Sequence, residues 1–138
     1  MSSRSLNDLD KFTHDAAVAH LQLCKAEGVE LLIYCTKRSN QEQNTLHAIG
    51  REKPGRIVTN ARAGQSAHNP NNDGYASAYD CCPMVGGKPM WDSKHPLWAI
   101  VGRCGEEAGL VWSGRWRGKL RETAHFQNPS WKIGRAHV

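Results

Sequence analysis

The chain has 138 residues, of which 39% are apolar and 22% are charged. This length and balance suit one globular domain spanning residues 1–138, with room for a single core and not for a second module. No uninterrupted apolar stretch of about 18 residues is present, which excludes a membrane-spanning helix. The N-terminus also lacks the apolar run of a secretory signal, so we expect the chain to reside at first in the cytoplasm.

Charge and cysteine content bear on the possible binding partners and on the redox state of the thiols. A formal charge of +5 permits attraction to any polyanion, but it does not choose among nucleic acid, anionic lipid and acidic envelope polymers. The densest basic cluster is either a solvated face or a rim that attracts a substrate; it comprises Arg115, Arg117, Lys119 and Arg121. The five cysteines lack the spacing of a disulfide framework or of a structural zinc site, which favours reduced thiols.

In chain order, helix and strand patterns alternate in the first half. Leu6–Glu27 predicts a helix, and Val29–Cys35 predicts a buried strand. Ser39 and Glu42 form a capping box at the start of a second helix that runs to about Gly50. The expected apolar stripe of the first helix comprises Leu9, Phe12, Ala16, Ala19 and Leu23.

The second half begins with a long loop. Arg51–Asn72 is rich in Gly, Pro and Asn, and only Ile57 and Val58 suggest a short extended piece. Ala78–Val85 and Lys88–Trp91 then flank Gly86-Gly87, a sequence that predicts a tight hairpin.

A third helix is predicted from Pro96 to Gly109, with Gly102 and Gly105 inside it. Those glycines weaken a helix unless a neighbour packs closely against them. Two short strands, Leu110–Trp112 and Ala124–Gln127, follow on either side of a basic loop. The whole pattern predicts one small α+β domain.

Four side chains in the second half suggest metal chemistry. His68 and Asp80 border the long loop, and Glu122 precedes His125 by three residues. Two imidazoles and one carboxylate can hold Zn²⁺ while a fourth position stays open for water, and a further carboxylate can act as general base. Taken singly, His68 fits a polar loop residue, Asp80 a strand-end carboxylate and His125 a core histidine. The other histidines, at positions 14, 20, 47, 95 and 137, are expected at the surface or at helix caps.

Three longer runs resemble a known family. They are Gln65-Ser66-Ala67-His68 through Ala76-Ser77-Ala78-Tyr79-Asp80, then Gly109-Leu110-Val111-Trp112-Ser113-Gly114-Arg115-Trp116, and Glu122-Thr123-Ala124-His125-Phe126-Gln127. The segment Ile33–Ser39, followed by Glu42 and Gln43, fits the same pattern. Over nearly the whole chain, these runs resemble the phage endolysin branch of the D-alanyl-D-alanine carboxypeptidase and L-alanyl-D-glutamate endopeptidase family.

The resemblance implies a Hedgehog-like or D,D-peptidase-like α+β fold, with a central antiparallel sheet flanked by helices. It implies one zinc ion held by His68, Asp80 and His125, with Glu122 as the catalytic acid/base. Arg38 and Ser66 match family positions expected near the substrate or behind the ligands, although a structural salt bridge is an equal alternative for Arg38. Trp112, Arg115 and Trp116 are candidates for the cleft wall, and core packing is the favoured alternative for both tryptophans.

Two departures from the family pattern affect the ligand assignment. The compact form of the motif has a shorter step from histidine to aspartate, and here Asn-Pro-Asn-Asn-Asp-Gly lengthens the loop after His68. Asp73 therefore rivals Asp80 as a ligand. We prefer Asp80 because it leads into a strand, whereas Asp73-Gly74 is typical of a turn. Ala76 also replaces the usual glycine before the Ala-x-Asp element.

The implied substrate is the stem peptide of peptidoglycan, and the implied role is host cell lysis. We expect a monomer without a separate wall-binding domain or stable membrane insertion, and without nucleic acid as a partner. A separate holin would let the protein pass from the host cytoplasm to the periplasm and cell wall at lysis.

Other readings stay open. The alternatives are a D,D-carboxypeptidase or endopeptidase that uses the same site, and a non-catalytic basic domain that binds the envelope or nucleic acid. A lysozyme-like enzyme would need a second carboxylate as a convincing partner for Glu122.

Overall fold

A computed structural model describes residues 2–118 and 121–131. Its elements, in chain order, are the 3₁₀ turn η1 (Leu6–Asp8), α1 (Lys11–Ala26), β1 (Glu30–Cys35), α2 (Asn40–Ala48), β2 (Ala78–Val85), β3 (Lys88–Pro89), α3 (Leu97–Glu107), β4 (Val111–Trp112), the 3₁₀ turn η2 (Ser113–Arg115) and β5 (His125–Gln127). The predicted α+β class is confirmed. None of the helices in the described part of the chain is long and apolar enough to cross a membrane.

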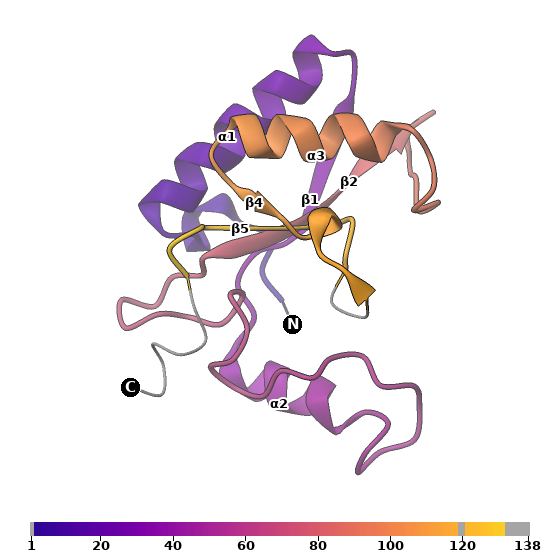
Figure 1. The fold of residues 1–138 in the computed structure, drawn as a ribbon. Coiled ribbons are helices and arrows are strands. Elements are labelled where there is room, and N and C mark those ends of the chain that lie inside the picture. Colours follow the sequence, from indigo (N-terminus) through magenta and orange to yellow (C-terminus); the bar gives the residue numbers. More distant parts are fainter. Residues whose placement is uncertain (1, 119–120, 132–138) are drawn as a thin grey trace.

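The strands form one antiparallel sheet in the order β1-β2-β5-β4, with β3 paired to β2. Helices α1 and α3 pack together over one face of this sheet, and α2 lies apart from them beside the long loop (Figure 1). The core lies between the two helices and the sheet, where Tyr79 and Phe126 are fully buried. Strand β2 therefore has paired neighbours on both sides, which places its residues at the centre of the fold.

The first helix begins later than the sequence pattern predicts. Asp10 caps it by accepting a hydrogen bond from the Thr13 amide at 2.8 Å, and Leu9 forms a bridge with Ala76 instead of a helical turn. The predicted stripe is also rotated, since Phe12 is 49% exposed. Smaller side chains fill the buried face and allow α1 to approach α3 and the sheet closely; they are Thr13, Ala16, Ala17, His20 and Cys24.

His20 corrects a second expectation, because it lies in the core and not at the surface. Its Nδ1 atom is 2.6 Å from the Tyr79 hydroxyl and its Nε2 atom is 2.8 Å from the Val101 carbonyl oxygen. A neutral imidazole satisfies both contacts, with Nε2–H donating to Val101 and Nδ1 accepting from Tyr79. Burial lowers the pKa of His20 to about 4, which keeps the ring neutral in the folded protein.

The two glycines inside α3 allow aromatic side chains to pack closely against the helix. A Cβ atom on Gly102 would lie 2.3 Å from the Trp112 ring, and one on Gly105 would lie 2.4 Å from the Phe126 ring. The close neighbours that the sequence required are therefore the side chains of β4 and β5. Through these contacts α3 supports the two strands that lead into and out of the Glu122 segment.

Other local predictions are confirmed near both ends of the long loop. Ser39 and Glu42 form the capping box of α2, and Gly86 and Gly87 take positive φ values of 58° and 76° in the β2–β3 turn. Ile57 and Val58, where a short extended piece is expected, are exposed and belong to no strand of the described structure.

Candidate metal centre

Asp80 lies on the central strand of the sheet and has a partner on each side. It is paired with Cys35 on β1 and with His125 on β5. The carboxylate is mostly buried, with a side-chain exposure of 14%. The strand ladder therefore brings together three residues that are far apart in the sequence.

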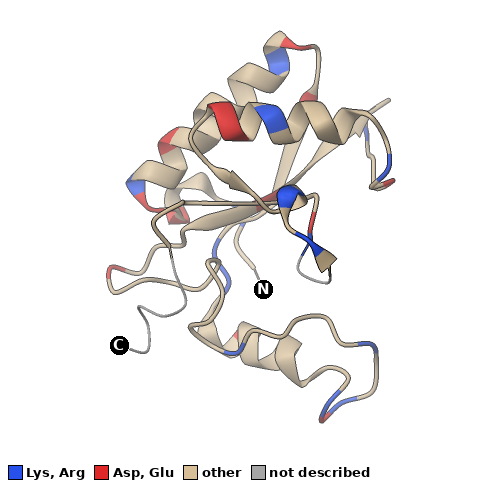
Figure 2. Cartoon of the chain, in the orientation of Figure 1, with Lys and Arg blue, Asp and Glu red and all other residues tan. Residues whose placement is uncertain are grey.

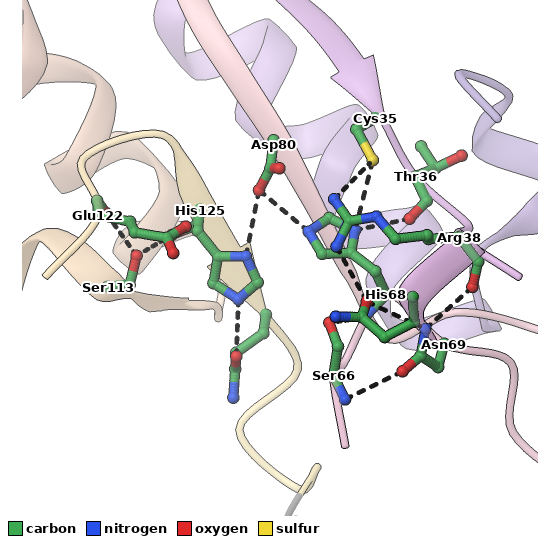
Figure 3. A network of polar contacts seen from close by, with 12 residues as sticks. Cys35, Thr36, Arg38, Ser66, His68, Asn69, Asp80, Ser113, Glu122 and His125 are labelled. Atoms are coloured by element: carbon green, nitrogen blue, oxygen red, sulfur yellow. Dashed lines mark hydrogen bonds and ion pairs between the residues drawn. The ribbon is translucent and has the colours of Figure 1, made fainter. Parts of the chain in front are cut away.

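His68 reaches Asp80 from the long loop. Its Nε2 atom lies 3.0 Å from Asp80 Oδ1, and its Nδ1 atom lies 2.7 Å from the carbonyl oxygen of Thr36 (Figure 3). The loop is held in place through its backbone, because the Arg38 amide donates to the His68 carbonyl oxygen at 2.8 Å and the His68 amide donates to Ser66 Oγ at 3.2 Å. His68 is consequently buried and aimed at the carboxylate.

His125 faces the same carboxylate oxygen from the opposite side. Its Nδ1 atom lies 3.1 Å from Asp80 Oδ1, and its Nε2 atom lies 2.7 Å from Gln127 Oε1 (Figure 3). The His68 and His125 rings meet edge to face with 5.1 Å between their centroids. One nitrogen of each ring therefore points toward Asp80, while the other nitrogen is engaged by a hydrogen-bond acceptor.

This donor set suits a divalent metal. A metal-ligating histidine commonly donates its second N–H to a carbonyl or amide oxygen, which fixes the tautomer and the orientation of the ring. Thr36 and Gln127 supply those acceptors here, while His68 Nε2 and His125 Nδ1 both face Asp80, where a metal would bind. Ligand atoms of Asp80, Glu122 and His125 lie within 4.8 Å of one another, as do those of Cys35, His68 and Asp80. The two groups share Asp80.

The electrostatics of this cluster follow from its burial. Burial opposes ionisation of Asp80, but the adjacent His68 and His125 hold the pKa of its carboxyl well below the ordinary value. Burial likewise lowers the pKa of His68, but the negative charge of Asp80 outweighs this effect and raises it to about 10. A positive charge is therefore favoured beside Asp80, whether it is carried by an imidazolium or by a metal ion.

Glu122 lies at the open side of this cluster, in the exposed turn before β5. Its backbone is anchored by the fully buried Ser113, whose hydroxyl contacts the carbonyl oxygens of both Glu122 and His125. The Glu122 amide also donates to the Ser113 carbonyl oxygen at 3.3 Å. The carboxylate is thus placed near the ligand cluster while it stays accessible to water, as a general base requires.

Arg38 and Ser66 lie behind His68. Arg38 donates from Nη1 to Gln43 Oε1 at 3.1 Å and from Nη2 to Cys35 Sγ at 3.8 Å. Its Nε atom is buried without a hydrogen-bond partner. Within residues 2–118 and 121–131 no carboxylate pairs with Arg38, so the salt-bridge alternative is not found there. Ser66 acts through its contact with the His68 amide.

The three candidates for the cleft wall separate in the structure. Trp112 stacks on Phe126 with 6.3 Å between ring centroids and is buried, so it belongs to the core. The Arg115 guanidinium pairs with Glu106 at 2.8 Å and covers the Trp112 ring. Only Trp116 approaches the ligands directly, with its ring centroid 6.0 Å from that of His125.

The rival ligand and the remaining histidines lie elsewhere. Asp73 is exposed, and its amide donates to Asn71 Oδ1 in the loop turn. His14 and His47 lie on helix surfaces, and His95 accepts a hydrogen bond from the Leu97 amide at the start of α3, as expected. His137 lies outside the described residues.

Several residues of the site were not singled out from the sequence: Cys35, Thr36, Ser113 and Gln127. Gln127 carried a usable signal, because residues two apart on a strand share a face and His125 was already a candidate. Burial raises the pKa of the Cys35 thiol, but the neighbouring His68 and Arg38 outweigh burial and lower it. The contacts of Thr36 and Ser113 depend on the tertiary fold and carry no local pattern.

The chain is 29% identical to the peptidoglycan L-alanyl-D-glutamate endopeptidase CwlK of Bacillus subtilis, over 88% of this chain and 74% of the relative. The chain is a homologue of L-alanyl-D-glutamate endopeptidases. No family model matches the chain.

A solved structure supports the fold of the endopeptidase homologue. The crystal structure of the Serratia marcescens L-Ala D-Glu endopeptidase ChiX matches it with a TM-score of 0.58 and 22% sequence identity. The match covers 93% of this chain and 88% of that chain. The expected peptidase-like α+β fold is therefore confirmed.

Proposed function

We propose that this chain is a zinc-dependent peptidase that hydrolyses the L-alanyl–D-glutamate bond in peptidoglycan stem peptides. The observation that carries the proposal is the convergence of His68 and His125 on Asp80, with Glu122 at the open side. The named activity of the relatives supports the choice of bond. His68 Nε2, Asp80 and His125 Nδ1 would hold one zinc ion.

Different residues of the chain have different roles in amide hydrolysis. A bound zinc ion supplies Lewis acidity, which polarises the scissile carbonyl group and lowers the pKa of water. Glu122 accepts a proton from the attacking water and later delivers it to the leaving amine. Thr36 and Gln127 keep the two imidazoles in the tautomers that bind metal, and Ser113 keeps Glu122 beside them.

The biological setting belongs to the same proposal. We infer a phage endolysin that accumulates in the host cytoplasm and reaches the periplasm and cell wall at lysis, through a membrane pore made by a separate holin. The residue runs around His68, Trp112 and His125 support this setting through their resemblance to the endolysin branch. The protein would act as a monomer and as an antimicrobial agent against the host wall.

Two alternatives make different predictions. A D,D-carboxypeptidase or endopeptidase would use the same residues and cut nearer the D-alanine end of the stem peptide. A nucleic-acid-binding or envelope-binding domain would need a basic face and would bind in a strongly salt-dependent manner. Acidic and basic residues are interspersed along α1 and α3, whereas basic residues prevail around the long loop (Figure 2), so the salt dependence of binding has to be measured to separate the two functions.

The test is metal removal followed by reconstitution. Purified protein is treated with a chelator, dialysed and supplied again with zinc, and the release of new amino groups from purified peptidoglycan is measured. We expect hydrolysis to disappear with the chelator and to return at about one zinc ion per chain. Equal hydrolysis by chelated and reloaded protein would contradict the zinc-peptidase proposal.

A further inference from the structure

We propose that a pocket beside Glu122 binds the free carboxylate of the glutamate residue at the cut bond, and that Arg121 is the cation that recognises it. The inference rests on the proposed function, because it concerns the substrate of the same site. It adds a specificity-determining residue that lies outside the metal cluster.

The pocket opens directly beside the proposed general base. Its volume is about 340 Å³, and its walls include Tyr34, Trp91, Ser93, Trp98, Arg121 and Glu122. Four segments contribute these residues: β1, the loop after β3, α3 and the turn before β5. A group bound here would therefore lie close to the peptide bond on which Glu122 acts.

Arg121 offers a guanidinium that has no acidic partner in the part of the chain that the structure describes. The Nε atom of Arg121 donates to the Gly114 carbonyl oxygen at 3.1 Å. No carboxylate within residues 2–118 and 121–131 forms an ion pair with Arg121. Arg115 differs, because Glu106 pairs with it. The Gly114 contact orients Arg121, and among the described residues its two terminal nitrogens have no hydrogen-bond partner, so they suit a planar anion such as a carboxylate.

The aromatic walls add a surface for the peptide. The Trp98 side chain is buried and contributes one wall. Trp91 is 58% exposed, and its ring centroid lies 5.3 Å from that of Tyr34. The two rings form an apolar rim for the peptide chain.

The chemistry of the substrate supplies a matching group. Glutamate has two carboxyl groups, and only one of them continues a linear peptide, so the other remains a free carboxylate near the bond that is cut. Glu122 lines the same pocket and would repel that carboxylate. Arg121 offsets this repulsion, and a neutral carboxamide in place of the carboxylate would lose the attraction.

The experiment compares two peptides that contain the L-alanyl–D-glutamate bond and differ only in whether the free carboxylate is intact or amidated. We expect the wild-type protein to prefer the acid by roughly tenfold or more in kcat/KM, mostly through KM, as a charge-assisted hydrogen bond allows. R121Q should slow cleavage of the acid and leave the amide nearly unaffected, which abolishes the preference.

Arg117→Gln is the matched control, because it removes the same charge from the same loop and Arg117 does not line the pocket. This variant should keep the wild-type preference. If Arg121→Gln cleaves both peptides more slowly by the same factor, or keeps the wild-type preference, the carboxylate site is wrong although the peptidase proposal stands. If the wild-type protein cleaves neither peptide, both proposals fail.

Discussion

His125 lies directly opposite Asp80 on the β2–β5 ladder, and its Nδ1 atom is 3.1 Å from Asp80 Oδ1. The backbone hydrogen bonds of two strands therefore set the separation of two candidate metal ligands. His68 joins them from a loop whose backbone is tied to Arg38. Two of the candidate ligands therefore lie on the sheet, and the third lies on a loop that is anchored through its backbone.

Replacement of Glu122 should separate catalysis from metal binding. We expect Glu122→Ala to keep its bound zinc and to lose at least about a hundredfold in rate, the scale of general acid–base catalysis. Zinc content is measured by atomic absorption and rate by release of amino groups. Glu107→Ala is the control, since Glu107 is another exposed carboxylate and pairs with Arg103. Full activity in folded, metal-loaded Glu122→Ala would remove Glu122 from the mechanism.

The choice between Asp80 and Asp73 can be tested by metal content alone. Asp80 contacts both histidines, whereas Asp73 lies exposed in a turn. We expect Asp80→Ala to lose stoichiometric zinc and Asp73→Ala to retain it, because only the first change removes a ligand. The opposite pattern, with normal zinc in Asp80→Ala and none in Asp73→Ala, would show that the ligand assignment is wrong.

Gln127 should tune the metal site without touching the metal. Its side-chain oxygen accepts from His125 Nε2 at 2.7 Å. Loss of such a contact typically weakens metal binding by about 10-fold to 100-fold. We expect Gln127→Ala to show this effect in a competition titration with a chromophoric chelator, and Gln22→Ala on the exposed side of α1 to show none. Unchanged affinity in both variants would argue that Gln127 plays no part.

Acid should destabilise the fold through His20. Its folded-state pKa is lowered to about 4 from an ordinary value of 6.5, so the unfolded chain binds a proton that the folded chain does not. The stability from neutral His20 is therefore present above pH 6.5 and lost as pH falls toward 4. The pKa difference corresponds to about 3 kcal/mol.

The measurement is urea unfolding at pH 7 and pH 4.5, with chelator present throughout. His20→Gln should be less stable at pH 7 and should lose less stability than the wild type between the two pH values. His14→Gln, which changes a partly exposed histidine on the same helix, should follow the wild type. The same acid loss in wild type and His20→Gln would show that another group controls this range.

Local patterns predicted the elements better than the faces they bury. The capping box at Ser39 and the glycine turn at Gly86 depend on short-range geometry, and both were predicted from the sequence. The buried face of α1 was wrong because Phe12 outweighs Thr13 in hydrophobicity, whereas close packing selects the smaller residue. His20 was misplaced for a different reason, because the acceptor and the donor that satisfy its ring lie on Val101 and Tyr79, far along the chain.

In the candidate site, too, the sequence pointed to some residues and missed those whose contacts depend on the tertiary fold. His68, Asp80, Glu122 and His125 were selected as candidates by residue type and spacing, and the structure brings them together in two overlapping groups. The residues that orient them were missed, because Thr36 contributes a backbone carbonyl that any residue has and Ser113 contacts two carbonyls from another turn. Core packing was the favoured interpretation of Trp112, and the structure confirms it by placing Gly102 against its ring.

The measurement that tests the central claim most directly is the mass spectrum of purified Gram-negative peptidoglycan after digestion, with and without a zinc chelator. We predict chelator-sensitive release of peptides that begin at D-glutamate. Loss of terminal D-alanine alone would instead establish a carboxypeptidase. An absence of new peptide ends from a folded, zinc-loaded sample would contradict the peptidase account and favour the binding domain.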